Sequence, residues 1–255
     1  MFELLNDCDS ALGLPNLKST SPSEMMTIAI AFHQQRYRTF KDYYTKPVLV
    51  HWEKAFPQAV SYQRFVSWMP SVLLPLCAYL KSCFGKCTGI SFIDSSTLKL
   101  CHNRRIHQHQ VFAELAAGGK TSVDWFFGFK LHRVVNEHAE LLKLTLTPGN
   151  TDEPKPVAQR LRAMLGKVFA DRGYVSQRLT HQLLKTWGIE FFAQPRRSMK
   201  NCLMRLTDKL LARKRSIIES IIDQLKNISQ IEHSPHRSPV NFLVNLVSGL
   251  IAYCH

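Results

Sequence analysis

The pattern of hydrophobic and polar positions changes near residue 89, and the two parts predict different structures. Before that point apolar residues recur at helical spacing. Ser21-Pro22-Ser23-Glu24 has the composition of a helix start with a capping box. Further helices are predicted over residues 46–55, 61–69 and 71–84. We therefore expect a helical amino-terminal region over residues 1–89.

After residue 89, alternating apolar positions predict strands, and periodic apolar positions predict helices between them. In chain order we expect a strand over 89–93 that ends at Asp94, strands over 124–135 and 140–147, a helix over 154–165, a strand over 167–170 that ends at Asp171, a helix over 175–187, a strand over 189–193 and a long amphipathic helix over 207–228. Hairpin-linked strands followed by alternating units indicate an α/β fold, a mixed sheet with helices on both faces.

Three acidic residues stand out in this second part. Asp94 and Asp171 are predicted at strand ends, where ligands gather in such sheets. On the long helix, Arg215 and Lys226 fall within about 40° of Glu219. The opposite stripe, which we expect to be buried, carries Leu210, Ile217, Ile221 and Ile228. An ordinary Arg–Glu helix pair explains Glu219 alone, but two strand-end aspartates in addition favour a site.

The composition of the chain indicates which kind of partner it binds. The chain has 33 Lys and Arg against 19 Asp and Glu, a formal net charge of +14, which favours a polyanion such as nucleic acid over a merely basic surface. A helical amino-terminal region that touches DNA and an ordinary helical subdomain stay equally open. No apolar stretch of about 18 residues predicts a membrane span. Seven irregularly spaced cysteines and an acidic amino terminus favour free thiols in the cytoplasm.

Carboxylates drawn together in a cleft repel one another, and a divalent cation is their natural stabiliser. Hard oxygen ligands suit Mg²⁺ or Mn²⁺. Two such ions about 4 Å apart can bind the attacking and the leaving oxygen at a phosphodiester. Asp94, Asp171 and Glu219 are therefore the candidate metal ligands.

The segments FIDSSTLKLCHNRR, WFFGFKLHRVVN, LKLTLTPGNTDE, FADRGYVS and RSIIESIIDQLK resemble the DDE transposases of bacterial insertion sequences, in particular insertion-sequence family 982. The resemblance implies a ribonuclease-H-like catalytic domain over residues 90–231, followed by a linker and apolar segment over 232–255. It assigns the three acids to Asp94, Asp171 and Glu219. The related Tyr-x2-Arg-x3-Glu-x6-Lys signature matches at Arg215, Glu219 and Lys226, but its Tyr position is Ala212.

The resemblance also implies an activity. A phosphodiester at the end of a mobile element is hydrolysed to free a 3′-hydroxyl, which then attacks target DNA. The implied cofactors are two Mg²⁺ or Mn²⁺ ions, and the implied partner is double-stranded DNA, both transposon ends and target, bound by a homodimer. The implied location is the bacterial cytoplasm, at the nucleoid. A nuclease or resolvase of the same fold, and a DNA-binding relic that has lost catalysis, for example by truncation of a tail, stay open as alternatives.

Further polar residues are candidates for DNA contacts, each with a solvated surface as the simpler explanation. His102, Asn103, Arg104 and Arg105 follow the Asp94 strand and are expected beside the scissile phosphate. Lys130 and His132 alternate along one strand and point to the same face, either to the cleft or to solvent. Arg196, Arg197 and Lys200 lie in a basic loop. The remaining alternatives are a zinc site among Cys83, Cys87, Cys101, His102, His107 and His109, whose spacing fits no usual finger, and the acids Asp124, Asp152 and Asp223.

Overall fold

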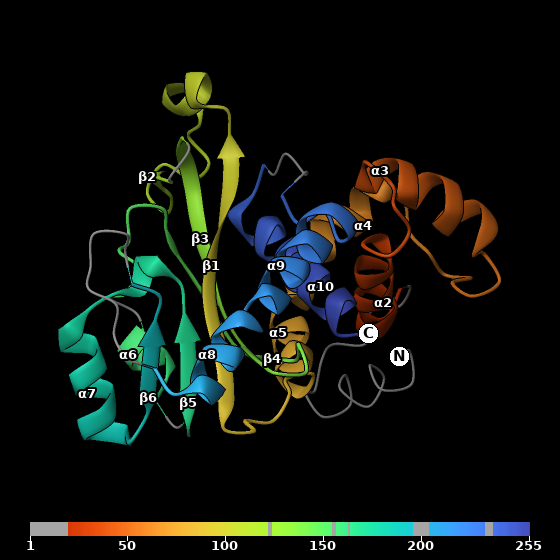
Figure 1. Ribbon diagram of the computed structural model, residues 1–255. Helices are drawn as coiled ribbons and strands as arrows, with labels where there is room; N and C mark the ends of the chain where they lie inside the picture. The colour runs from red at the N-terminus through yellow and green to blue at the C-terminus, as the bar shows by residue number, and fades with distance from the viewer. Residues whose placement is uncertain (1–19, 122–123, 155–156, 163, 196–203, 233–236) are drawn as a thin grey trace. The chain divides into compact units, whose positions relative to one another are not determined.

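The computed structural model describes residues 20–121, 124–154, 157–162, 164–195, 204–232 and 237–255 (Figure 1). They form two compact units: one comprises the chain up to Cys83 together with Asp223–His255, and the other is Phe84–Ile222. The sequence divides the chain after residues 89 and 231 instead. The roles predicted for residues 1–89, 90–231 and 232–255 stay predictions.

The first unit is helical within the described residues, as the amino-terminal periodicity predicts. Helix α10, the longest described helix, packs against α2, α5 and η2. The predicted capping box is confirmed at α2, where the Ser21 hydroxyl accepts from the Glu24 amide and the Glu24 carboxylate accepts from the Ser21 amide. The elements are α2 (Pro22–Phe32), α3 (Phe40–Tyr43), η1 (Tyr44–His51), α4 (Tyr62–Trp68), η2 (Met69–Val72), α5 (Leu73–Ser82), η5 (Gln224–Ile228) and α10 (Pro239–Cys254).

A buried histidine joins distant parts of this unit. His33, directly after α2, lies with its Nδ1 2.5 Å from the carbonyl oxygen of Ser229. Burial lowers the pKa of His33 to about 4, so the ring is neutral at pH 7 and donates from Nδ1. No helix among the described residues, α10 included, is both long and apolar enough to cross a bilayer.

The second unit is built on a mixed sheet with the strand order β2-β3-β1-β5-β6 among the described residues, and β4 also pairs with β3. The pairs β1–β3, β2–β3 and β3–β4 are antiparallel, while β1–β5 and β5–β6 are parallel. This confirms the predicted α/β class and agrees with a ribonuclease-H-like sheet. The elements are β1 (Ile90–Cys101), η3 (Asn103–Gln108), β2 (Ala117–Lys120), β3 (Trp125–Asn136), β4 (Leu141–Pro148), α6 (Val157–Arg160), β5 (Lys167–Ala170), η4 (Arg172–Tyr174), α7 (Gln177–Trp187), β6 (Glu190–Ala193), α8 (Leu206–Arg213) and α9 (Ser216–Asp223).

Helices cover both faces of this sheet. On one face the alternate residues Ile93, Val168 and Phe191 belong to a buried cluster that includes Leu179 and Leu183 of α7. On the other face the rings of Phe92, Phe169 and Phe192 lie in a row, with neighbouring ring centroids 5.7 and 5.1 Å apart. On that second face Asp208 of α8 pairs with Lys167, the first residue of β5.

Two predicted elements differ from the structure in extent, and one strand was not predicted. Strand β1 continues seven residues beyond Asp94, because its hydroxyl-rich second half pairs residue by residue with β3. Helix α6 has only four residues, where 154–165 was expected. Strand β2 was not predicted, because AGGK offers no apolar alternation.

The predicted long helix over 207–228 is also interrupted. Helix α8 ends at Arg213, a turn spans residues 214–215, and α9 begins at Ser216. The break changes which residues are buried, so that Ile218, Ile221 and Leu225 are enclosed while Leu210 and Ile228 are 52% and 45% exposed. Of the predicted apolar stripe, only Ile221 is buried.

The Lys167–Asp208 pair gives a test of this fold. Asp208 is 3% exposed, and its Oδ1 lies 2.5 Å from Lys167 Nζ. We expect Asp208→Asn to lower the free energy of unfolding by about 1–3 kcal/mol, the usual net worth of a hydrogen bond to a charged group. Urea denaturation would measure this. The matched control is Asp42→Asn, which breaks an exposed pair with Lys46 and should change little. Equal effects at both positions would contradict the prediction.

Candidate active site

Asp94 lies inside β1 and not at its end, which corrects the sequence prediction. It stands opposite Arg133 of β3 in the antiparallel ladder. Because side chains alternate along a strand, Asp94 shares the sheet face of Phe92. That is the face which α8 approaches through the Lys167–Asp208 pair. Pairing with β3 on one edge and β5 on the other therefore fixes the backbone that leads up to Asp94.

Asp171 follows β5 directly, as predicted. The parallel pairing of β1 with β5 ends at Ile93 opposite Ala170, so Asp94 and Asp171 are the next residues on neighbouring strands. Adjacent strands lie about 4.8 Å apart. The backbone of Asp171 is still extended, with φ −77° and ψ 172°, so the alternation carries its side chain to the same face as Asp94.

Arg215 connects the second and third predicted acids. It lies in the turn between α8 and α9, and its Nη2 is 3.4 Å from Asp171 Oδ1 and 3.9 Å from Glu219 Oε1. The Arg215 side chain is 15% exposed, whereas those of Asp171 and Glu219 are 43% and 70% exposed. The acids are thus accessible from solvent, and the guanidinium between them is the shielded partner.

The electrostatics of the site act most strongly on Asp94. The pKa of Asp94 is raised to about 6, mainly by desolvation and to a smaller extent by the negative charge of Asp171. The guanidinium groups of Arg133 and Arg215 act in the opposite direction. Burial of Asp94 therefore outweighs the two arginines, and the charge of Asp171 adds only a smaller unfavourable contribution.

Sequence reasoning missed two residues that support this site. Arg133 is 1% exposed and faces Asp94 across the ladder; a cation within a run of apolar strand residues was the available signal. Glu153 accepts a hydrogen bond from Ser95, the neighbour of Asp94, at 2.8 Å. Its carboxylate also fills the space that a Cβ at Gly173 would occupy, so Glu153 packs against the turn that follows Asp171.

Lys130 and His132 do not face the acids. Their ladder partners are Thr97 and Ser95, so they point to the opposite side of the sheet from Asp94. Lys130 donates to the carbonyl oxygen of Thr151 at 3.0 Å, and His132 is buried with Nε2 2.9 Å from the hydroxyl of Thr147. The expectation that they point to the cleft or to solvent is therefore wrong for His132, which is enclosed.

The remaining predicted DNA contacts lie elsewhere. His102, Asn103, Arg104 and Arg105 begin the short helix η3, at the far end of β1. At about 3.3 Å per strand residue they are about 25 Å from Asp94 and not beside it. Lys226 belongs to the other compact unit, where its Nζ lies 3.1 Å from Glu232. Arg196, Arg197 and Lys200 fall outside the described residues.

The alternative ligands gain no support from their surroundings. No three His, Cys, Asp or Glu side chains converge on a possible metal position in the described part of the chain, so neither the Cys101–His109 region nor the three acids form a closed cage. Asp124 accepts from the backbone of Trp125 at the far end of β3. Asp223 accepts from the Asn227 side chain. Asp152 lies exposed in the loop after β4.

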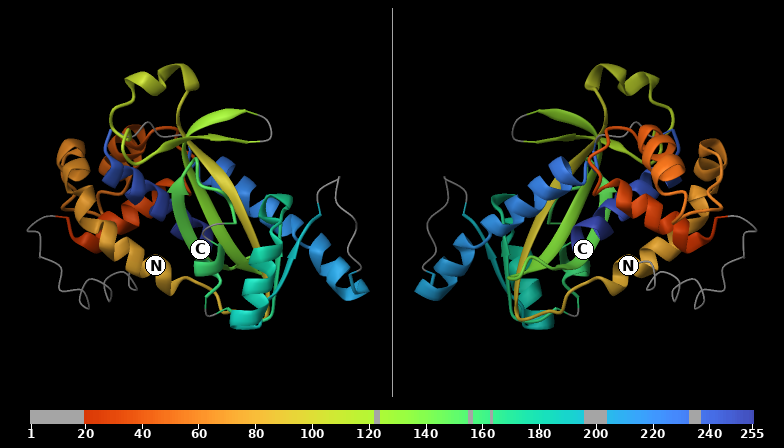
Figure 2. Two further views of the ribbon diagram at one scale, coloured as in Figure 1. Left: turned by 90° about the vertical axis from the view of Figure 1, so that its left-hand side faces the viewer. Right: turned by 90° about the vertical axis from the view of Figure 1, so that its right-hand side faces the viewer.

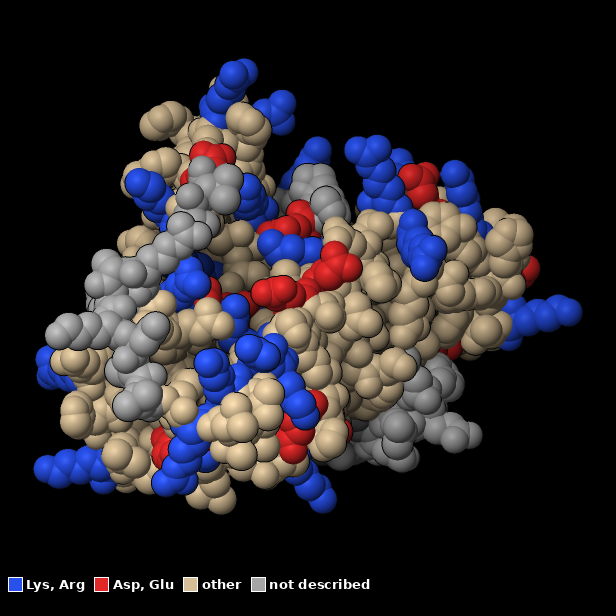
Figure 3. Space-filling model, viewed as in Figure 1, with Lys and Arg blue, Asp and Glu red and all other residues tan. Residues whose placement is uncertain are grey.

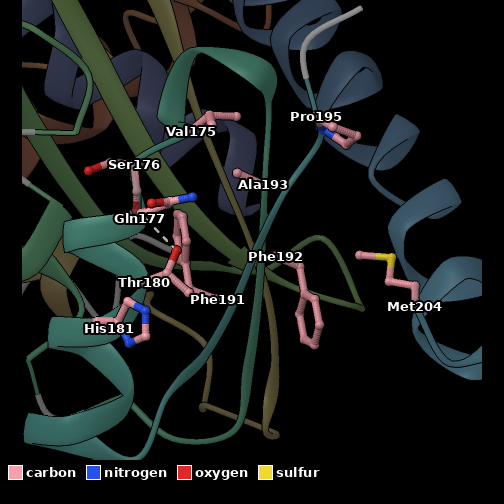
Figure 4. A pocket seen from close by; sticks show the side chains of 10 residues that line it. All are labelled: Val175, Ser176, Gln177, Thr180, His181, Phe191, Phe192, Ala193, Pro195 and Met204. Atoms are coloured by element: carbon pink, nitrogen blue, oxygen red, sulfur yellow. Dashed lines mark hydrogen bonds between the residues drawn. The ribbon is translucent and has the colours of Figure 1, made fainter. Parts of the chain in front are cut away.

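A hollow of about 430 Å³ opens beside the carboxyl edge of the sheet (Figure 4). It lies between the start of α7 and β6, with Phe191 and Phe192 directed to opposite sides of the strand. Its lining is mostly apolar, and polar groups come from α7. The lining residues are Val175, Ser176, Gln177, Thr180, His181, Phe191, Phe192, Ala193, Pro195 and Met204.

The donor chemistry of the acids nevertheless fits a hard divalent cation. Asp94, Asp171 and Glu219 supply only carboxylate oxygens, the ligands that Mg²⁺ and Mn²⁺ prefer. Burial raises the pKa of Asp94, with a smaller contribution from Asp171, and a bound cation would favour the ionised carboxylate against both. Asp171 and Glu219 are also exposed enough to exchange Arg215 for another positive partner.

Comparison with known protein families gives a match over most of the second half of the chain. The family described as transposase DDE domain matches residues 84–239, more than half of the chain, and contains all three acids. A search of curated proteins finds no match. The narrower resemblance to insertion-sequence family 982 stays a prediction.

The position of Asp94 predicts a pH-dependent difference in stability. Its pKa is about 6 in the folded chain and near 3.8 in an unfolded one, so between these values the unfolded state binds fewer protons. Wild-type stability should therefore fall relative to that of Asp94→Asn as pH rises from about 4 to about 6, with a constant difference above that. Urea denaturation of both proteins across this range measures it. A pH-independent difference would contradict the raised pKa.

Proposed function

This chain belongs to the transposase DDE domain family, and we propose that it cleaves DNA strands with divalent metal ions and joins the freed 3′ end to target DNA. Transposases act on DNA, and DDE domains are in general DNA-cutting enzymes that use divalent metals. The observation that carries the finer proposal is the parallel register of β1 and β5, which makes Asp94 and Asp171 neighbours on one face.

The metal ligands in this proposal are Asp94, Asp171 and Glu219. Bound cations supply Lewis-acid activation of the attacking oxygen and stabilise charge on the leaving oxygen. Asp94 is the fixed ligand, because β1 is paired on both edges up to Ile93. Glu219 is the adjustable one, since its side chain is 70% exposed at the start of α9.

The two arginines have separate roles. Arg133, buried in the sheet, keeps a positive charge beside Asp94 and so favours its ionised form at neutral pH. Arg215 pairs with Asp171 and Glu219 and lowers their repulsion before the DNA and the cations bind. A guanidinium released from the two carboxylates is also suited to a phosphate oxygen. Ala212, where related signatures have Tyr, offers no hydroxyl or ring for that purpose.

The proposed partners are transposon ends and target DNA, bound by a homodimer in the bacterial cytoplasm at the nucleoid. The charge of +14 supports a polyanionic partner. His102, Asn103, Arg104 and Arg105 stay proposed DNA contacts, now at a distance from the acids. Lys130 could contact DNA only on the other face of the sheet. A role for Lys226 with Glu219 is proposed only because the two residues match the family signature.

Substitution of the acids tests the metal site. We expect Asp94→Asn, Asp171→Asn and Glu219→Gln each to lower strand cleavage by more than about 100-fold, beyond the 10–100-fold cost of losing an outer-shell partner. DNA binding in EDTA should persist in all three. A gel assay with a labelled duplex and Mn²⁺ measures cleavage, and anisotropy measures binding.

The matched control is Asp223→Asn, four residues from Glu219, which should cleave like wild type. Loss of cleavage in Asp223→Asn with full activity in Glu219→Gln would move the third acid to Asp223. Mg²⁺ titration by calorimetry adds a second readout. A wild-type chain that binds DNA but takes up no Mg²⁺ would be a binding relic and not an enzyme.

Joining separates a transposase from a nuclease or resolvase of the same fold. We expect a duplex with a pre-formed 3′-hydroxyl end to become linked to a supercoiled plasmid in the presence of Mn²⁺, because the same acids serve both displacements. Products on an agarose gel measure this. A blocked 3′ end is the control and should give none. Cleavage without joined product at any Mn²⁺ concentration would favour the nuclease.

A further inference from the structure

The second half of β1 and the first half of β3 form an arm that runs past the carboxyl ends of β5 and β6 (Figure 1). Strand β3 is paired on both edges along this arm, with β1 on one side and β2 and β4 on the other. Helix η3 and the β2–β3 hairpin project at its end in both views of Figure 2. DNA that reaches Asp94 and Asp171 lies beyond the same carboxyl edge, so the arm runs beside it.

The end of the arm, which we call the arm tip (His102–Lys120 and Trp125), is packed on a small aromatic core. Phe112 is 1% exposed and contacts His109 and Phe129, with ring centroids 5.6 and 6.0 Å apart. The Asn103 side chain donates to the carbonyl oxygen of Trp125 at 2.8 Å, which ties η3 to β3. These contacts hold the surface of the tip in place.

The surface of the arm tip combines positive charge with an aromatic ring. Trp125 is 59% exposed, and Lys120 Nζ lies 5.8 Å from the centre of its ring. Arg104, Arg105 and Lys120 of the tip are exposed, as is Lys99 on the adjoining part of β1, and among the described residues none of the four is in a salt bridge. Lys and Arg side chains stand out at this end of the molecule in Figure 3. Two exposed acids, Glu114 and Asp124, lie nearby.

We propose that the arm tip is a DNA-docking surface in which Trp125 packs on a base or sugar face while Arg104, Arg105 and Lys120 contact phosphates. An exposed aromatic ring beside exposed cations is the combination that nucleic-acid surfaces use. This rests on the proposed function, because DNA is taken as the partner. It adds a second contact about 25 Å from Asp94, which corresponds to about 7 base pairs of duplex.

The charge and the ring have different signatures in a binding experiment. Each phosphate contact adds about 0.9 to the slope of log affinity against log salt. Arg104→Ala with Arg105→Ala should therefore lower that slope by about 2. Trp125→Ala should leave the slope unchanged and weaken binding by about 5- to 150-fold, the range for one lost aromatic stack. Trp125→Phe should recover most of the affinity.

The measurement is fluorescence anisotropy with a labelled 30-base-pair duplex in EDTA, over a salt series, on the full chain. Leu184→Ala, which removes a side chain 53% exposed on α7, is the matched control and should bind like wild type. Circular dichroism melts establish that each variant is folded. Photocrosslinking through p-benzoylphenylalanine at position 125 should attach the chain to the duplex.

Several results would overturn the proposal. Wild-type affinity and slope in the Trp125 and Arg104/Arg105 variants would do so, and so would a crosslink to a second copy of the chain in place of DNA. A Trp125→Ala protein with altered oligomeric state in sedimentation but normal DNA binding would assign Trp125 to self-association. Because binding is measured without metal, loss of affinity in these variants supports the arm tip even if wild type cleaves no DNA.

Discussion

The parallel pairing of β1 with β5 is the constraint on which the rest of the candidate site depends. Only four residue pairs, from Ile90–Lys167 to Ile93–Ala170, set this register. A slip of one residue in β5 would turn Asp171 to the face occupied by the α7 core, because side chains alternate. Such a slip would also turn the Phe169 ring into the space that Val168 and Ala170 fill in that core. Packing of the apolar core on one face of the sheet thus positions Asp94 and Asp171 on the other face.

The same face shows how the protein manages a concentration of negative charge. A carboxylate held in the sheet interior is costly unless a positive group compensates it. Here one arginine is supplied by the neighbouring strand and another by the turn between α8 and α9. The first is fixed by backbone pairing, whereas the second belongs to a break in helical structure. One counter-charge is therefore buried in the sheet, and the other lies beside two carboxylates that are open to solvent.

Much of this arrangement could be predicted from the sequence, and the limits have physical causes. The strands after residue 124 were predicted within one or two residues, since their alternation is strong, and the family assignment is confirmed by the match over residues 84–239. The extent of β1 was missed because Ser95, Ser96 and Thr97 look like a turn until their partners in β3 are known. The break at residues 214–215 was missed because a two-residue turn hardly disturbs the helical spacing of the apolar residues on either side.

The side-chain partners were harder still. Arg133 and Glu153 act through contacts between segments about 40 and 60 residues apart from Asp94, and no local pattern reports such contacts. Lys130 and His132 were assigned to the correct strand and to a common face, but the orientation of that face depends on the register with β1. Alternation in the sequence shows which residues share a face of a strand, but not which of the two faces lies toward Asp94.

The arm built from β1 and β3 has a consequence for how such a protein could change during evolution. Because β3 is hydrogen-bonded to other strands along both edges, the arm is a stiff spacer, and its length is set by the number of residues in its strands. Removing two residues from each strand would keep every side chain on its face and shorten the span by about 7 Å. That equals the length of about two base pairs of duplex DNA. Strand length would then encode the spacing between two contacts on the same nucleic acid, independently of the chemistry at either one.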